Sequence, residues 1–100
     1  MSAEEIKLPM IRIGFNSGEQ IATVSPSAMV LEAHSRVAFR LDGDIKGTAK
    51  VMLPAEGLVI HLTSGEATQV EVTRTGVYYA VVALSNPGRV GAMAVLICDP

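Results

Sequence analysis

Short apolar runs recur about every ten residues along this chain, and each is closed by Gly, Pro, Asn, Asp or Ser. This spacing is typical of the strands and turns of an all-β sandwich or barrel. Apolar residues at helical spacing are nearly absent. One hundred residues can close one hydrophobic core but not two. We therefore predict a single all-β domain over residues 1–100, a Greek-key β-sandwich of about seven to eight strands.

Strands are predicted from alternation, because successive side chains of a strand point to opposite faces of its sheet. Alternation is clearest over residues 37–41, and the following Asp42-Gly43-Asp44 predicts a hairpin turn rather than a calcium loop. Pro9, inside the run 6–15, predicts an edge strand or a bend. Residues 85–88, Ser-Asn-Pro-Gly, predict a turn. Further strands are predicted over residues 21–24, 29–31, 50–53, 58–62, 70–73 and 93–98.

The run over residues 77–84 differs from the others because it is apolar at nearly every position. Strands that are buried on both faces have this pattern, whereas strands with one solvated face alternate. We therefore predict that residues 77–84 form a central strand covered on both sides.

The composition predicts apolar residues on the surface. Apolar residues make up 49% of the chain and charged residues 18%, and the mean hydropathy is +0.38. An average soluble domain is about 25% charged, and a domain of this size leaves roughly a third of its chain surface exposed. A homo-oligomer or a permanent protein partner would cover such apolar surface. The alternative is a core filled by many small residues such as Ala and Val.

Charge and aromatic content argue against several ligand classes. The net charge is −2, and the eight basic residues are scattered along the chain, so a nucleic-acid partner is not expected. The four aromatic residues and the lack of Trp offer no stacking platform for bases or sugars. No small-molecule ligand or cofactor can be identified from the sequence. The basic residues are Lys7, Arg12, Arg36, Arg40, Lys46, Lys50, Arg74 and Arg89.

The sequence also bears on location. Met1-Ser2-Ala3-Glu4-Glu5 shows neither the basic region nor the apolar run of a signal peptide, so we expect a cytoplasmic protein, unless a leader has been removed. The longest apolar stretch, residues 77–84, is too short to span a bilayer.

Three stretches carry a family resemblance. Residues 25–39 read Ser-Pro-Ser-Ala-Met-Val-Leu-Glu-Ala-His-Ser-Arg-Val-Ala-Phe, residues 75–79 read Thr-Gly-Val-Tyr-Tyr, and residues 91–97 read Gly-Ala-Met-Ala-Val-Leu-Ile. In this order they resemble the cupredoxins, the small copper-binding Greek-key sandwiches that include plastocyanin and azurin. The resemblance implies a cupredoxin-like sandwich. An immunoglobulin-like sandwich is the alternative, because it also contains alternating strands and a Gly-x-Tyr corner.

The resemblance implies copper-ligand positions that this chain does not fill. A type 1 copper site needs two imidazoles and a thiolate, with a weak axial sulfur. Counted from Gly76 as in the family, the thiolate position is Val82. The two imidazole positions fall in residues 47–49 and 85–88, which contain no His. Met93 stands near the axial position, but a thioether alone cannot hold copper. The resemblance therefore implies a cupredoxin-like domain without type 1 copper.

No catalytic, cofactor-binding or metal-binding residue is predicted, and the chain is not expected to be an enzyme. His34 and His61 are the only imidazoles, and a serine nucleophile would need such a base at a shaped site. Cys98 is the only thiol and is predicted to be a small core or interface residue. The competing hypothesis is a small copper-binding or electron-transfer protein with an atypical site built from these residues or the methionines. Core filling is predicted for Met10, Met29, Met52 and Met93.

Overall fold

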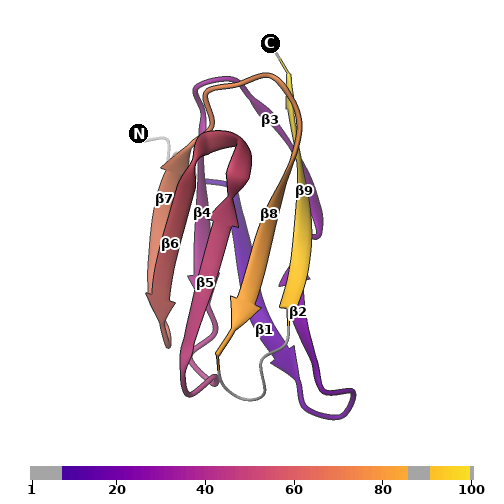
Figure 1. Cartoon of the computed structure of the whole chain (residues 1–100), viewed down its shortest axis with the longest axis vertical. Coiled ribbons are helices and arrows are strands. Elements are labelled where there is room, and N and C mark those ends of the chain that lie inside the picture. Colours follow the sequence, from indigo (N-terminus) through magenta and orange to yellow (C-terminus); the bar gives the residue numbers. More distant parts are fainter. Residues whose placement is uncertain (1–7, 86–90, 100) are drawn as a thin grey trace, which may run out of the picture.

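The computed structural model describes residues 8–85 and 91–99, which form nine strands and one short 3-10 turn, η1 (Figure 1). This is one strand more than the upper end of the predicted range of about seven to eight, because each apolar run of the sequence forms a separate strand. The elements are β1 (Met10–Asn16), β2 (Ile21–Ser25), β3 (Ala28–Glu32), β4 (Arg36–Leu41), β5 (Thr48–Leu53), η1 (Pro54–Glu56), β6 (Leu58–Thr63), β7 (Ala67–Glu71), β8 (Gly76–Leu84) and β9 (Gly91–Asp99).

The strands form two facing sheets, which confirms the all-β sandwich. One sheet has four strands in the order β2-β1-β4-β7, and the other has five in the order β3-β9-β8-β5-β6. Two pairings are parallel, β1 with β4 and β3 with β9, and the others are antiparallel. The parallel pairs join strands that are distant in the sequence, so the chain crosses repeatedly between the sheets.

The space between the sheets is filled by apolar side chains. Val37, Phe39 and Leu41 on β4 are fully buried, as the alternation predicted, and they pack with the inward residues of the facing sheet. Among the described residues no polar or charged side chain is buried. The core therefore relies on apolar burial and packing.

One prediction about local structure is wrong, and another is wrong in one of its two alternatives. Pro9 does not mark an edge strand, because β1 starts after it and lies inside its sheet, between β2 and β4; the bend stays a prediction. Asp42-Gly43-Asp44 does not close a hairpin, because β4 and β5 belong to different sheets. The chain crosses between the sheets at this point, and the buried Ile45 follows the crossing. The turn predicted over residues 85–88 lies, apart from Ser85, outside the described residues.

Side chains and glycines shape the other turns as the sequence suggested. Oδ1 of Asn16 accepts hydrogen bonds from the backbone N–H groups of Gly18 (3.0 Å) and Glu19 (3.1 Å), which closes the turn between β1 and β2. Gly65, between β6 and β7, has a φ of 77°, a conformation that costs glycine little.

A polar cluster ties η1 to the start of β8. The Tyr78 hydroxyl donates to the backbone oxygen of Arg74 (2.7 Å) and lies 3.0 Å from Oε2 of Glu56. Glu56 also accepts hydrogen bonds from the backbone N–H of Thr73 (3.0 Å) and from its hydroxyl (2.9 Å). These contacts link the β5–β6 turn to the segment between β7 and β8, which passes from one sheet to the other.

The cluster shifts the ionisation of both acidic groups. The hydrogen bond from the Thr73 backbone holds the pKa of Glu56 below its usual value. Burial raises the pKa of Tyr78 to about 12, and the carboxylate of Glu56 acts in the same direction. The neutral phenol beside a carboxylate is therefore the form that the fold favours.

Replacing Tyr78 tests this cluster. Tyr78→Phe should lower the free energy of unfolding by about 0.5–1.5 kcal/mol near neutral pH, because the part-buried contacts to Glu56 and to the Arg74 backbone oxygen lose the hydroxyl. Since the pKa of Tyr78 is raised in the folded state, the unfolded chain loses this proton first, and the contribution fades as pH rises from about 10 toward 12. Urea unfolding of both proteins across this range should show the difference shrinking. A constant difference would contradict the assigned ionisation.

Candidate functional site

The outer face of the five-stranded sheet is apolar across all five strands. Because side chains alternate along β8, Tyr78, Ala80 and Val82 point into the core, while Val77 and Tyr79 point outward. The neighbouring strands alternate in register with β8. Together their outward residues form a continuous surface, the outer apolar face, which consists of Val30, Met52, Val59, Val77, Tyr79, Val81, Met93, Val95 and Ile97.

Cross-strand pairing arranges this face in rows. Val77 lies opposite Ile97, and Ile97 lies opposite Val30 on β3. A second row runs from Met93 through Val81 to Met52, which pairs with Val59 on β6. Tyr79 pairs with Val95 between these rows. Cβ atoms of paired residues lie about 5 Å apart, so the rows form one surface without polar interruptions.

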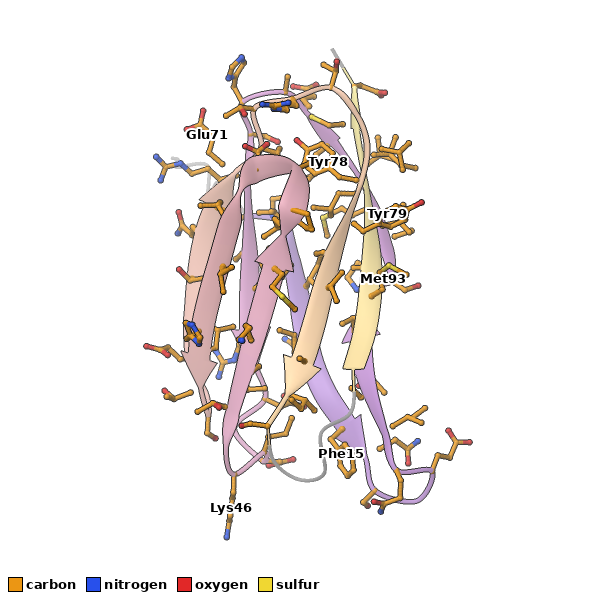
Figure 2. The ribbon with its side chains drawn as sticks, viewed as in Figure 1. Phe15, Lys46, Glu71, Tyr78, Tyr79 and Met93 are labelled. Atoms are coloured by element: carbon orange, nitrogen blue, oxygen red, sulfur yellow. The ribbon has the colours of Figure 1, made fainter. Side chains whose placement is uncertain are left out.

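Several of these side chains are far more exposed than large apolar residues usually are. Val30 is 64% exposed, Val77 62%, Val59 56%, Met93 52% and Tyr79 50%. Tyr79 and Met93 lie near each other over β8 and β9 in Figure 2. Single exposed apolar residues are common, but a contiguous set of this size on one sheet face is unusual for a monomeric domain.

Charged and polar residues border the outer apolar face at two opposite corners. Glu32 and Asp99 are paired where β3 and β9 end. Lys50 and His61 are paired at the far ends of β5 and β6. All four side chains are exposed. The face therefore has two carboxylates at one corner and the ammonium group of Lys50, beside an imidazole, near the diagonally opposite corner.

The outer face of the four-stranded sheet has a different character. Arg12 and Arg40 are opposite each other on β1 and β4, and Arg36 lies opposite Glu71 on β7. Nη1 of Arg36 is 3.4 Å from Oε1 of Gln69. This second face carries charged residues among its apolar ones, of which Ile21 is 45% exposed, so the contiguous apolar surface belongs to the five-stranded sheet.

The prediction for residues 77–84 is confirmed in part. β8 lies at the centre of its sheet, between β9 and β5, but in the described structure only its inner face is covered. The sequence contains a signal for the outer apolar face. Residues 77–84 and 93–98 are apolar both at the positions that point to one side of the sheet and at those that point to the other. That signal could not show which set faces solvent.

The end of the sandwich where the resemblance places copper ligands has a hollow lined by Thr48, Ala49, Lys50, His61, Ala83, Leu84 and Ser85. Val82 is buried in the core, 1% exposed. Oγ1 of Thr48 and Oγ of Ser85 are 2.6 Å apart, and the backbone N–H of Ser85 donates to the backbone oxygen of Thr48 (3.0 Å). These neutral oxygens are not the ligands that copper prefers, and the imidazole that lines the same hollow is that of His61. Residues 86–90, which complete the implied ligand loop, lie outside the described structure.

Met93 is not near an axial position. It pairs with Val81 and is exposed on the outer apolar face, whereas Val82 points to the opposite side of the sheet. The prediction of core filling is also wrong for Met93, and Met52 is half-buried on the same outer face. Met29 does pack against the core.

The other candidate ligands are dispersed. His34 lies in the exposed turn between β3 and β4, where its Nδ1 is 3.6 Å from Oε2 of Glu71. His61 is exposed on β6, and Cys98 is buried in the core. Within residues 8–85 and 91–99, no three side chains of His, Cys, Asp or Glu are grouped as a metal-ligand set.

Comparison with known proteins relates the chain to copper proteins by fold. No family model and no curated protein matches the sequence. A purple cupredoxin from Nitrosopumilus maritimus has a TM-score of 0.62 at 17% identity, over 91% of this chain and 99% of that protein. The reduced Cu(I) form at pH 4 of an amicyanin variant has a TM-score of 0.60 at 10% identity, over 95% of this chain and 87% of that one.

A copper-containing nitrite reductase from Thermus scotoductus is also similar, with a TM-score of 0.63 at 15% identity. The match covers all of this chain but only 24% of the reductase. The chain thus has the cupredoxin fold, and identities this low show the fold alone. In the described part of the chain, no helix is long and apolar enough to cross a membrane.

Two substitutions on β9 should separate its inner and outer faces. Leu96→Ala removes a fully buried side chain and should lower the free energy of unfolding by about 2–5 kcal/mol. Met93→Ala, three residues earlier but on the outer apolar face, should change it by no more than about 0.5 kcal/mol. Denaturant unfolding at low micromolar protein measures both. Equal losses would contradict the assignment of the two faces.

Proposed function

We propose that this chain is a non-enzymatic cupredoxin-like domain without type 1 copper that acts by protein-protein interaction through the outer apolar face. The observation that carries the proposal is the set of half-exposed Val, Tyr and Met side chains that is continuous across five strands, whereas the outer face of the other sheet is interrupted by Arg12, Arg36 and Arg40.

Physical chemistry supports a binding role for this surface. Burial of apolar area is favourable by about 25 cal/mol per Å², so covering the face releases free energy that the isolated chain does not use. Tyr and Met are enriched at protein interfaces and Lys and Glu are depleted, which is the composition found here. Tyr79 borders a shallow hollow of about 220 Å³ lined by Pro54, Ala55 and Val77, into which an apolar side chain could fit.

The residues at the implied ligand positions support the proposed absence of type 1 copper. The thiolate position holds a buried valine, and the one thiol of the chain, Cys98, is in the core. The Thr48 and Ser85 hydroxyls satisfy each other at the nearby sheet end. Among the described residues at this sheet end, His61 offers one imidazole, whereas a type 1 site needs two imidazoles and a thiolate.

Photo-crosslinking tests the interaction surface. Tyr79 is replaced by a photo-reactive benzoylphenylalanine, which preserves an aromatic side chain, and Gln69 on the opposite sheet is replaced by the same residue as the control. We expect protein-protein crosslinks from position 79 and none above background from position 69, in purified chain or in cells of the source organism. Equal or absent crosslinking at both positions would overturn the proposal.

Copper titration tests the absence of a type 1 site. Addition of Cu(II) to the full chain should produce no intense visible thiolate-to-copper band, because the only sulfhydryl is buried and Val82 cannot coordinate. The Cys98→Ala variant is the matched control. A strong visible band that is lost in Cys98→Ala would instead establish the atypical copper site.

A further inference from the structure

We infer that the partner of the outer apolar face is a second copy of this chain, which packs sheet against sheet about a two-fold axis. This inference rests on the proposed function. It adds the identity of the partner and the orientation of the two copies.

The need for a second layer is encoded in β8 and β9. Both strands are apolar on both faces, as in sheets that are covered on each side, yet the described chain covers only the inner face. A second copy of the chain offers an apolar sheet of the same dimensions as this covering layer.

The corner charges favour self-association in one orientation. A two-fold contact places the same surface on both sides, so each corner meets a corner of the other copy. The two-fold axis lies in the plane of the interface and is perpendicular to the line that joins the two charged corners. Glu32 and Asp99 of each copy then lie over Lys50 and His61 of the other. Opposite charges then meet twice, and the apolar rows meet between them. The strands of the two sheets cross steeply in this arrangement rather than running side by side.

The area of the face predicts a weak dimer. Five strands about 4.8 Å apart, each presenting about seven residues, span roughly 20 Å by 25 Å, or about 500 Å² per copy. Two copies together bury about 1,000 Å², the lower bound for a specific interface. We therefore expect a dimer with a dissociation constant in the micromolar range, populated when the chain is abundant.

Sedimentation equilibrium of the full chain measures this association. The unmodified chain should show a monomer-dimer equilibrium between about 1 and 500 µM. Met93→Glu and Tyr79→Glu place a charge inside the face and should weaken dimerisation by about tenfold or more, the equivalent of about 1.4 kcal/mol. Gln69→Glu adds the same charge to the opposite sheet and should leave the equilibrium unchanged. Denaturant unfolding of each variant confirms that it is folded.

A charge exchange tests the orientation. At low salt, Glu32→Lys and Lys50→Glu should each weaken the dimer, by about two- to tenfold. The double variant restores opposite charges across the two-fold axis and should recover most of the loss. Absence of recovery would overturn the proposed orientation.

The outcomes separate this inference from the proposed function. If the unmodified chain stays monomeric and position 79 crosslinks to a different protein, the inference that the partner is a second copy is overturned. The proposed interaction surface is then retained. A monomer with no crosslink from position 79 overturns both. A dimer that Met93→Glu and Tyr79→Glu leave intact uses another surface and also overturns the inference.

Discussion

The antiparallel pairing of β8 with β9 is the interaction on which the rest of the structure depends. Eight consecutive residue pairs join the two strands, β3 adds to one side of this ribbon and β5 to the other. Because side chains alternate, the register assigns Tyr78, Val82 and Leu96 to the core and Val77 and Met93 to the outside. A slip by one residue would exchange the two sets. One ladder therefore creates both the hydrophobic core and the outer apolar face.

The contacts around this ribbon explain why the outer apolar face is presented as a regular surface. The hydroxyl of Tyr78 joins the start of β8 to Glu56 of η1, and Ser85 joins its end to Thr48 of β5. Both ends of the central strand are thus connected to the neighbouring β5–β6 pair. A surface built on strands that are held at both ends needs little rearrangement to bind, which lowers the entropic cost of association.

The cupredoxin fold is kept here while the implied ligand positions carry other chemistry. Val82 contributes to the same core as its neighbours on β8, and Thr48 and Ser85 satisfy each other by hydrogen bonds. In this chain the described strand ends are used for packing and hydrogen bonding, and the unusual feature is on the outside of the sheet. A shared fold does not by itself assign a function, which has to be argued from the residues of a site.

The sequence by itself determined the all-β sandwich, the strand positions, the central place of residues 77–84 and the absence of His at the implied ligand positions. These depend on local alternation, turn residues and identity, which neighbouring residues reveal. Only the tertiary structure decided that β1 lies inside its sheet, that Asp42-Gly43-Asp44 crosses between sheets and that Met93 faces outward. Each of these depends on strands far apart in the sequence. In a strand that is apolar on both faces, the alternation of residues does not indicate which face is buried. The pairing with strands that are distant in the sequence determines it.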